Sequence, residues 1–551
     1  MIGLPIVFKI RKWLDEAEFR EILKVSEYVG HENGYRKFQL NLEKALKNGY
    51  LFEDIRGIIN EYGAVLEGSA NDLERAFEEH SPVFTWSQIK GVVKIQLTKL
   101  LYQSTRDFLR KIGSKYSDSS SGRVVVEVLP YYAYDALQYF RNLGLSVVDA
   151  DNIFSDKPLM LKPELKNVAL RPYQEEALNK WIENRGRGII SLPTGSGKTL
   201  IAIAAIVQKS VRTLVVVYTK EQVFQWQSFI TNCTTIPPSM VGLFYSGEKR
   251  LAPITITTYQ SGFRNINVLS PYFKMIVVDE VHHLPADKFK HIALHSLAVF
   301  RMGLSATPIR EDGKHEELFP LLGGIVYYKA PPELVERGFL APYNIVTVKV
   351  KMDSKERAAY EALRKRYRAL VGNKEFKQVL QEAYRGNYRA IEALKLHSEM
   401  RMLLAKSSVK VDKAVELALE EYRKGSKVIV FAQYVDQAKG IAERVNGLLL
   451  IGDTPENERK KVLEQFKSSP SGILVVTTVG DEGLDIPDAN VGIIVSGTSS
   501  KRQFIQRLGR LLRPKSGGGI AVLYEVILER TPEEFQAKKR KVLDIDSFDE
   551  P

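Results

Sequence analysis

The segment LPTGSGKT, residues 192–199, has the composition of a loop that binds phosphate. It follows the apolar run GIISL (188–192) and precedes the helical run TLIAIAAI, which is the strand–loop–helix order that such a loop requires. Its glycines let backbone N–H groups point at a phosphate, Lys198 can reach the β- and γ-phosphates of a nucleotide, and the Thr199 hydroxyl can bind Mg²⁺. The strict pattern has glycine where Leu192 stands, so a chance match in a flexible loop is the alternative. The residues expected to bind nucleotide are Pro193, Thr194, Gly195, Ser196, Gly197, Lys198 and Thr199.

An apolar run that ends in two adjacent acids supplies the partner of this loop. In KMIVVDEVHH (274–283), Asp279 would hold the hydrated Mg²⁺ and Glu280 would polarise the attacking water. An acidic pair at a strand end can also cap a helix, but the phosphate loop upstream favours catalysis. The neighbouring His282 and His283 do not predict a metal site, because adjacent side chains diverge and neither HExxH spacing nor cysteine support is present.

A basic segment near the end of the chain carries a third set of candidates. In QRLGRLLRP (506–514), Gln506, Arg510 and Arg513 are spaced i, i+4 and i+7, which places them on one face of a helix. Two guanidinium groups so aligned can both meet a γ-phosphate, as an arginine finger does. An ordinary basic helix end before Pro514 is the alternative for this segment taken alone. Its position at the end of a second α/β unit favours catalysis, because a nucleotide held between two units would be completed when they close.

Short β-branched runs separated by helix-length segments position these motifs. Continuous apolar strands of this kind indicate parallel sheets with both faces covered by helices. We expect two such α/β units in tandem, at residues 166–345 and 413–551. The predicted strands are GIISL (188–192), TLVVVY (213–218), ITITTY (254–259), KMIVVDE (274–280), RMGLSAT (301–307), KVIVFAQ (427–433), GLLLIG (447–452), GILVVTT (472–478) and VGIIVSG (491–497).

The segments outside these units have other patterns. Residues 346–412 are expected to form a helical insertion, because KERAAYEALRKRYRALV and NYRAIEALKLHSEMRMLLA have helical periodicity and few Gly or Pro. The basic residues in its first arm also fit a solvated helix face. Residues 1–75 and 76–165 are predicted to be two short modules of mixed α/β structure, and neither has a catalytic pattern.

The composition of the chain restricts the classes of protein to which it can belong. Its 551 residues suggest three or four domains at roughly 150 residues each, and its 44% hydrophobic content excludes intrinsic disorder for most of it. The single cysteine, Cys233, excludes a disulfide scaffold and a cysteine zinc site and fits a reducing compartment. No stretch approaches the roughly 20 apolar residues of a membrane span and the N-terminus has no secretory-signal pattern, so we expect a cytoplasmic protein without a membrane partner. The net charge of +13 permits a polyanionic partner.

The motifs and their order resemble those of superfamily-2 helicases, and more narrowly those of the XPB family in its archaeal form. The resemblance spans about residues 166–535, which is nearly the full motor. DEVHHLPA (279–286) is similar to the XPB version of motif II, and Arg310-Glu311-Asp312 is similar to the RED tripeptide of that family. The helical insertion lies where XPB proteins carry a thumb. The fold that the resemblance implies is α/β, with two tandem RecA-like parallel-sheet motor domains, a helical thumb insertion and an N-terminal mixed α/β region.

The resemblance also implies roles for residues that spacing alone does not identify. A glutamine in LRPYQ (170–174) would read the adenine, motif V would lie near the nucleotide and the DNA backbone, and motif III would couple ATP to strand movement. The residues concerned are Arg171 and Gln174 in LRPYQ, Gly483 and Asp485 in TTVGDEGLDIPD (477–488), Ser305, Ala306 and Thr307 of motif III, and Arg310, Glu311 and Asp312 of the RED tripeptide.

The function that the resemblance implies is an ATP- and Mg²⁺-dependent motor on duplex DNA and at forks. A 3′→5′ polarity and a role in nucleotide excision repair follow from the family, and promoter opening is a further role in its eukaryotic members. ATP would draw the two α/β units together and hydrolysis would let them part. Because the sequence has no nuclease motif, incision would need a separately encoded nuclease as a partner of this nucleoid-associated protein.

Three alternatives remain beside this interpretation. An RNA helicase would share the ATP chemistry, but the DEVH box and the RED tripeptide disfavour it. A motor subunit of a restriction nuclease would need the nuclease in another chain. A non-catalytic nucleic-acid scaffold would need an eroded phosphate loop or acidic pair, and neither is eroded. Residues 1–165 match the family's damage-recognition domain only weakly, so DNA, a partner protein or both are candidate ligands of that region.

Overall fold

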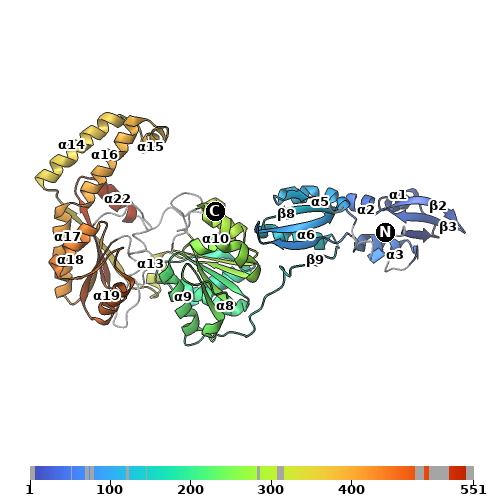
Figure 1. The fold of residues 1–551 in the computed structure, drawn as a ribbon, viewed down its shortest axis with the longest axis horizontal. Coiled ribbons are helices and arrows are strands. Elements are labelled where there is room, and N and C mark those ends of the chain that lie inside the picture. Colours follow the sequence, from blue (N-terminus) through green and yellow to red (C-terminus); the bar gives the residue numbers. More distant parts are fainter. Residues whose placement is uncertain are drawn as a thin grey trace.

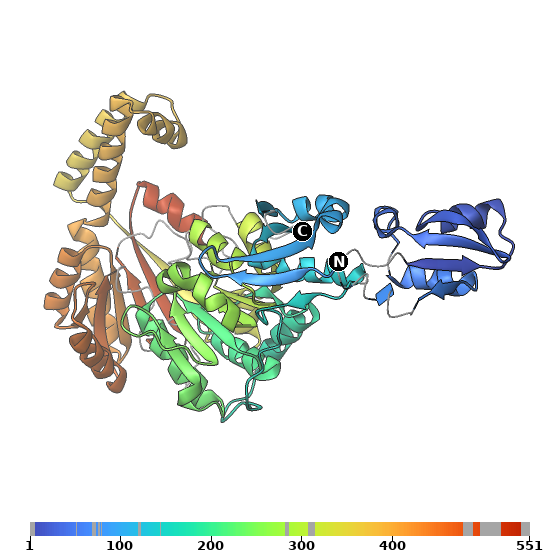
Figure 2. The same cartoon turned by 45° about the vertical axis from the view of Figure 1, so that its right-hand side comes forward.

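Strands form four sheets in the part of the chain that the computed structural model describes (Figure 1). Two small sheets lie at the N-terminal, blue end of the molecule, and two larger sheets form the rest of its body (Figures 1 and 2). The structure describes residues 6–50, 52–68, 73, 74, 78, 80–118, 123–143, 145–281, 286–306, 315–477, 489–495 and 520–541.

The first parallel sheet is built from strands with nearly continuous apolar sequences, which bury both of its faces. Its order is β12-β13-β11-β14-β15-β10-β16, so β14 lies beside β15 and β15 beside β10. The carboxyl ends of these three parallel strands therefore meet at one edge, where α/β proteins bind ligands. The strands are β10 (Arg187–Ser191), β11 (Thr213–Val217), β12 (Val241–Phe244), β13 (Ile254–Thr258), β14 (Met275–Val278), β15 (Phe300–Ser305) and β16 (Ile325–Tyr328).

Two groups of helices cover the faces of this sheet. Val215 and Val217 of β11 belong to the core that contains residues of α7, α8 and α9, whereas Leu214 and Val216 belong to the core formed with α10 and α11. This alternation follows the two-residue period of a strand. We call this unit, β10 to β16 with α7 to α13, lobe 1. Its helices are α7 (Pro172–Glu183), α8 (Lys198–Lys209), α9 (Lys220–Cys233), α10 (Tyr259–Leu269), α11 (Ala286–Leu294), α12 (His315–Leu318) and α13 (Pro331–Glu336).

The second parallel sheet has the order β17-β22-β21-β18-β20-β19. Two of its strands, β17 and β22, were not expected from the sequence, and they pair with each other in parallel over eight residues. Helices α17 and α18 share a core with one face of the sheet, and Phe466 of α19 belongs to the core on the other face. We call this unit lobe 2. Its elements are β17 (Tyr343–Val350), β18 (Lys427–Ala432), β19 (Leu448–Leu450), β20 (Gly472–Thr477), β21 (Val491–Ile494), β22 (Ala521–Leu528), α17 (Ser408–Arg423), α18 (Val435–Val445), α19 (Glu456–Ser468) and α22 (Pro532–Lys541).

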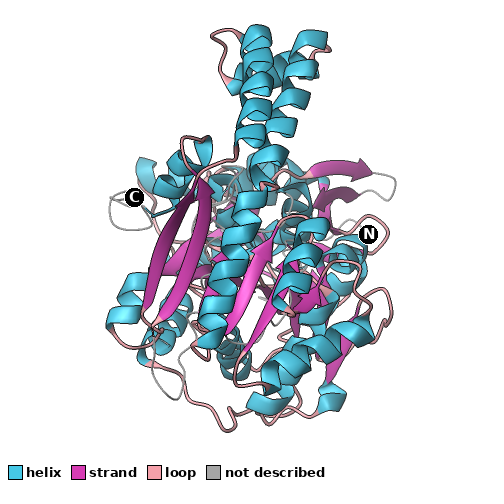
Figure 3. Cartoon of the chain, turned by 90° about the vertical axis from the view of Figure 1, so that its left-hand side faces the viewer, coloured by secondary structure: helices cyan, strands magenta, loops and turns pink. Residues whose placement is uncertain are grey.

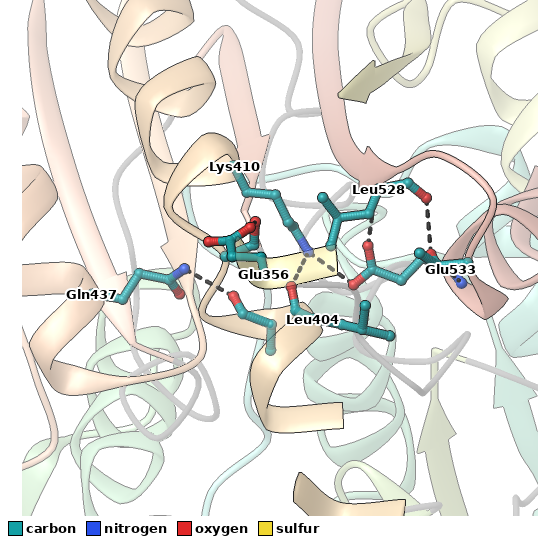
Figure 4. Close-up of polar contacts among 9 residues, drawn as sticks. Glu356, Leu404, Lys410, Gln437, Leu528 and Glu533 are labelled. Carbon is teal, nitrogen blue, oxygen red and sulfur yellow. Dashed lines mark hydrogen bonds and ion pairs between the residues drawn. The ribbon is translucent and has the colours of Figure 1, made fainter. Parts of the chain in front are cut away.

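The expected helical insertion between β17 and α17 is present, and we call it the thumb. It consists of α14 (Ser354–Val371), α15 (Phe376–Tyr384) and α16 (Tyr388–Ala405), and it rises from lobe 2 away from the sheets (Figure 3). Glu356 at the start of α14 accepts hydrogen bonds from Ser407 Oγ (2.5 Å) and from Ser408 N (2.7 Å), so it ties the beginning of the thumb to its end. Lys410 and Glu533, both buried, form an ion pair of 2.8 Å beneath this junction (Figure 4).

The N-terminal third forms two small antiparallel-rich sheets with helices, so the expected N-terminal mixed α/β region is present. The first has the order β2-β3-β1-β4 and the second β7-β8-β6-β5-β9. Their elements are β1 (Val7–Ile10), α1 (Glu16–Ile22), β2 (Ser26–Glu32), β3 (Tyr35–Leu40), α2 (Leu42–Lys47), α3 (Phe52–Glu61) and β4 (Val65–Glu67), then β5 (Val83–Ser87), β6 (Val92–Thr98), α5 (Lys99–Lys111), β7 (Lys115–Asp118), β8 (Arg123–Val128), α6 (Ala133–Asn142) and β9 (Val148–Asp149).

The second module, β5 to β9, is fixed to lobe 1 by polar contacts. Lys274, which precedes β14, donates hydrogen bonds to the carbonyl oxygens of Phe154 (2.9 Å) and Ser155 (3.1 Å) and to the hydroxyl of Tyr134. The guanidinium of Arg301 lies 4.7 Å from the ring centroid of Tyr131, at a distance typical of a cation–π contact. These contacts lie at the amino ends of the lobe 1 strands, opposite the edge that carries the sequence motifs.

Bilayer-spanning helices, judged by length and hydrophobicity, are absent from the described part of the chain.

Candidate active site

The phosphate loop connects β10 to α8 at the ligand-binding edge of lobe 1. Gly195 (φ 86°) and Gly197 (φ 78°) lie in the left-handed region, which a residue without Cβ adopts at little cost. Gly197 is also the N-cap of α8, so the first N–H groups of that helix, at the positive end of its dipole, face the loop. This arrangement is the one that anions such as phosphate bind.

Lys198, the first residue of α8, is buried within the loop. Its Nζ donates hydrogen bonds to the carbonyl oxygens of Leu192 (2.9 Å) and Pro193 (3.3 Å). Burial lowers the pKa of Lys198, and the nearby charges of Glu280 and Asp279 oppose that shift. The Lys198 amine, hydrogen-bonded to two carbonyl oxygens and close to two acids, can interact strongly with an anion that enters the loop.

Gln174 on α7 braces the phosphate loop. Its Nε2 donates hydrogen bonds to the carbonyl oxygens of Ser196 (2.9 Å) and Gly197 (3.3 Å), while its Oε1 accepts one from Arg171 N (2.9 Å). Tyr173 donates its hydroxyl to the same Ser196 carbonyl at 2.6 Å. Gln174 therefore contacts the loop through its amide, and Arg171 contacts the end of lobe 1 through a hydrogen bond to the carbonyl of Phe339 (3.0 Å).

The acidic pair follows β14 directly, at the same sheet edge. Asp279 is buried, and its Oδ2 accepts a hydrogen bond from the indole Nε1 of Trp226 (2.8 Å), while its Oδ1 accepts one from Glu280 N (2.9 Å). Tyr259 donates its hydroxyl to the backbone carbonyl of Asp279 (2.8 Å). Burial raises the pKa of Asp279, whereas the Trp226 hydrogen bond, the Lys198 charge and the Glu280 N–H favour the ionised carboxylate.

Glu280 has a backbone φ of 48°, in the left-handed region. A residue with a side chain adopts this region rarely, and such strain persists only where the surroundings impose it. Here the Glu280 N–H is held by the Asp279 carboxylate, so the two acids are fixed by one local structure.

Ser305 and Ala306 lie at the end of β15, between the acidic pair and the phosphate loop. Both are buried, and Ser305 pairs with Ser191 in the parallel ladder. The carbonyl of Ser305 accepts a hydrogen bond from Leu192 N (3.0 Å), which joins motif III to the first residue of the phosphate loop. The structure thus brings three of the predicted motifs to one edge of one sheet.

Several predicted residues lie outside the described part of the chain, and sequence reasoning missed others that lie inside it. Trp226 and Tyr259 contact Asp279 from α9 and α10, and Tyr173 contacts the loop from α7. No local pattern marks them, because their contacts depend on the strand order. The predicted residues outside the described ranges are His282, Thr307, Arg310, Glu311, Asp312, Gly483, Asp485, Gln506, Arg510 and Arg513.

A nucleotide with Mg²⁺ fits the residues that the structure does describe. Among them, no group of three or more His, Cys, Asp or Glu side chains could form a metal cage made of protein alone. Mg²⁺ does not need one, since it is commonly held by one or two carboxylates with phosphate oxygens and water. Asp279 and Thr199 would supply oxygen atoms of this kind. At Gly197 a Cβ would lie 2.5 Å from Gln174 Nε2, so the loop requires glycine at this position.

Two parallel-sheet lobes, one with a phosphate loop and an acidic pair, are the architecture of a helicase-type motor. Residues 167–310 match the family model "Type III restriction enzyme, res subunit", and residues 388–547 match "ERCC3/RAD25/XPB C-terminal helicase". The chain is 34% identical over 437 residues to the DNA 3′-5′ translocase XPB2 of Sulfurisphaera tokodaii. The match covers 78% of this chain and 96% of that protein. The chain therefore belongs to the XPB family and is an ATP-hydrolysing helicase.

More distant relatives are longer than this chain. The DNA 3′-5′ helicase XPB of Kineococcus radiotolerans is 31% identical, over 68% of this chain and 62% of that protein. The general transcription and DNA repair factor IIH helicase/translocase subunit XPB of Schizosaccharomyces pombe is 30% identical, over 72% of this chain and 48% of that protein. The chain thus spans about half to two thirds of these two relatives.

Proposed function

We propose that this protein translocates along duplex DNA with 3′→5′ polarity, at the expense of ATP bound with Mg²⁺ in lobe 1. The observation that carries the proposal is the meeting of a buried lysine and a buried aspartate at one sheet edge, in a chain similar along most of its length to a 3′-5′ DNA translocase. The match covers nearly all of that translocase, and both lobes and the thumb are present here.

The residues of lobe 1 divide the work on ATP. Lys198 and the N–H groups at the start of α8 bind and compensate the phosphates. Gln174, which braces the loop, reads the adenine, and Arg171 lies beside it. Asp279 and Thr199 hold Mg²⁺, which when bound neutralises charge that develops on the phosphates. Glu280 accepts the proton of the attacking water. Gln506, Arg510 and Arg513 of lobe 2 complete the site when the lobes close.

The DNA side of the proposal rests on sequence and charge. The resemblance to the family assigns the coupling of ATP to strand movement to motif III, with Ser305, Ala306 and Thr307. It assigns contacts with nucleotide and DNA backbone to Gly483 and Asp485 of motif V. Phosphate contacts carry no sequence information, so a motor that uses them can track any duplex. The net charge of +13 suits such contacts.

One titration tests the proposal. The ATPase rate is measured against equal lengths of duplex DNA, single-stranded DNA and RNA, with Lys198→Ala as the blank. We expect the strongest stimulation by duplex DNA and none in the blank. Stronger stimulation by RNA would make the protein an RNA helicase, and DNA binding without any ATPase would make it a scaffold.

We further propose that Arg310, Glu311 and Asp312 act with the thumb as a latch at the duplex junction. One cation and two anions beside a phosphate track serve simple affinity poorly, because the acids repel DNA. A triple alanine variant should lose strand opening while keeping DNA-independent ATPase. Equal loss of both activities would place the defect in folding or lobe closure instead.

We also propose a role in nucleotide excision repair, in the cytoplasm at the nucleoid, together with a separately encoded nuclease. The sequence contains no nuclease motif, and repair requires incision. Co-purification from native cells at low salt should recover a nuclease with this chain. A purification in which the motor is abundant and nuclease activity is absent would contradict the partnership.

A further inference from the structure

Trp226 is the one described side chain from outside the acidic segment that the structure hydrogen-bonds to the Asp279 carboxylate. It lies on α9, 53 residues before Asp279, and only 2% of its surface is exposed. Its Nε1 lies 2.8 Å from Asp279 Oδ2, and the backbone N–H of Glu280 lies 2.9 Å from Oδ1. Each carboxylate oxygen is therefore held by one donor, which fixes the rotation of the group.

Any buried indole N–H needs a hydrogen-bond acceptor. Trp181 is an example in which the acceptor is a backbone carbonyl far from any candidate catalytic group. Trp181 belongs to the same core, is fully buried, and donates its Nε1 to the backbone carbonyl of Arg301 at 2.9 Å. Trp226 differs because its partner is the carboxyl group of Asp279, a residue that is itself only 8% exposed. Burial works against that charge, and the indole N–H is one of the few groups that offset it.

We propose that Trp226 is a positioning residue for the metal-holding carboxylate of Asp279. The inference rests on the proposed function, because it assigns Asp279 to Mg²⁺. A carboxylate oxygen has more than one lone pair, so Oδ2 accepts the indole N–H and still has a site for a Mg²⁺-bound water. The indole thus aims the carboxylate through a hydrogen bond from α9. This is the way a second layer of hydrogen bonds tunes a metal ligand.

The side chain also belongs to a helix that reaches the other lobe. Glu221, in the first turn of α9, lies 4.0 Å from Arg459 of lobe 2. One helix, α9, therefore carries both Glu221, which faces lobe 2, and Trp226, which contacts the acidic pair. Glu221 provides a variant on the same helix that leaves the carboxylate untouched.

The test compares Trp226→Phe with Trp181→Phe and Glu221→Gln. Phenylalanine keeps most of the ring and removes the N–H donor, so each tryptophan variant loses one buried hydrogen bond. The affinity for ADP is measured by calorimetry in Mg²⁺ and again in EDTA, with the thermal midpoint as a check of folding. Because the phosphate loop is unchanged, ADP affinity in EDTA should equal that of the wild type in all three variants.

We expect the Mg²⁺-dependent gain in ADP affinity to fall by about 10-fold in Trp226→Phe and to stay at the wild-type level in both controls. In Asp279→Asn, which has already lost the carboxylate, adding Trp226→Phe should change the gain no further. An unchanged gain in folded Trp226→Phe, or an equal loss in Trp181→Phe, would overturn the proposal. If Trp226→Phe does not fold, Trp226→Met also lacks a hydrogen-bond donor and faces the same criteria. Wild-type protein that binds no ADP at all would instead refute the proposed function.

Discussion

At the scale of single residues, Asp279 and Glu280 are adjacent acids with different surroundings, which suit them to different roles. Asp279 has both carboxylate oxygens in hydrogen bonds and is suited to holding a cation. Glu280 is placed by a left-handed backbone and is less buried than Asp279. Two acids in different environments can take different roles, one fixed by hydrogen bonds and the other a proton acceptor.

Glu280→Gln should therefore bind ATP but hydrolyse it slowly. The amide keeps the size of the side chain and removes the base, and a general base typically contributes about 10²- to 10⁴-fold to a rate. Lys198→Ala should instead weaken nucleotide affinity, because the buried positive charge is lost. Single-turnover hydrolysis and nucleotide-binding titrations separate the two effects. Hydrolysis by Glu280→Gln at the wild-type rate would remove Glu280 from this role.

Gly197→Ala should damage the phosphate loop in two ways. The φ of 78° disfavours any residue with Cβ by about 1–2 kcal/mol, and the new Cβ would meet Gln174 Nε2 at 2.5 Å. Gly425→Ala is the matched control, because Gly425 has a φ of 84° and no heavy atom within 4 Å of its virtual Cβ. Both variants should lose stability through the backbone, Gly197→Ala at least as much as Gly425→Ala, but only Gly197→Ala should lose nucleotide affinity. Equal affinities in the two variants would show that Gln174 adapts freely.

At the scale of elements, most of the strands predicted from sequence are apolar runs buried on both faces, although the buried edge strand β12 was not predicted and the half-buried edge strand β19 was. TLVVV of β11 and MIVV of β14 are uninterrupted apolar runs, and they lie in the interior of their sheet. β17 is an edge strand whose residues are mostly half-buried and alternate in polarity, so it lacked that pattern. β22 carries the buried Glu525 in its centre, which interrupts the apolar run.

The candidate site was predictable to the extent that each motif is local. The phosphate loop and the acidic pair are short segments whose residue types reveal their chemistry. Their meeting follows from the strand order β14-β15-β10, which the parallel pattern makes plausible but does not specify. The Trp226 contact could not be predicted, since it joins residues far apart through helix packing.

The base of the thumb depends on the buried pair Lys410 and Glu533. Lys410 has no exposed surface and donates to Glu533 Oε1 (2.8 Å) and toward the Leu404 carbonyl (3.4 Å), while Glu533 Oε2 accepts from Leu528 N (3.0 Å; Figure 4). Lys410→Met leaves a buried carboxylate without its cation, which typically destabilises by about 3–5 kcal/mol. We expect a corresponding fall in the free energy of unfolding of lobe 2, measured by denaturant titration.

A double variant and a variant of a surface ion pair test whether the unpaired buried charge causes the loss of stability. Glu533→Gln added to Lys410→Met should restore much of the stability, because the unpaired charge disappears while the acceptor for Leu528 N remains. Lys413→Met breaks the partly exposed pair with Glu416 on the same helix and should change stability by less than about 1 kcal/mol. If Lys410→Met behaves like Lys413→Met, the buried pair does not hold the thumb base.

At the scale of the whole molecule, binding to DNA should depend strongly on salt and little on sequence. A chain with a net charge of +13 that follows phosphates releases condensed counterions from DNA when it binds. Affinity should therefore fall by at least about 10-fold between 50 and 200 mM salt, with a linear log–log plot. Fluorescence anisotropy on two unrelated duplexes measures both properties. A flat plot would indicate apolar or base-specific binding.

The junction of the second module with lobe 1 should depend on pH through Lys157. This half-buried lysine donates to the Pro271 carbonyl, and its own carbonyl accepts from Arg212 N (2.9 Å). Burial, followed by the charge of Lys274, lowers the pKa of Lys157 from 10.5 to about 8; Arg212 lowers it further and Asp149 opposes the shift.

Between about pH 8 and 10.5 the unfolded chain retains a proton on Lys157 that the folded chain has released, so the stability of the folded state rises with pH across this window. Below about pH 8 the lysine is charged in both states and the full burial penalty applies. Lys157→Met removes this dependence. The thermal midpoint of the wild type, relative to that of Lys157→Met, should therefore increase from pH 7 to pH 9.5, whereas Lys162→Met, at an exposed site in the same segment, provides the baseline. A constant difference between the wild type and Lys157→Met over this range would mean that Lys157 stays charged in the folded protein, and that its contacts at the junction are those of a solvated ammonium.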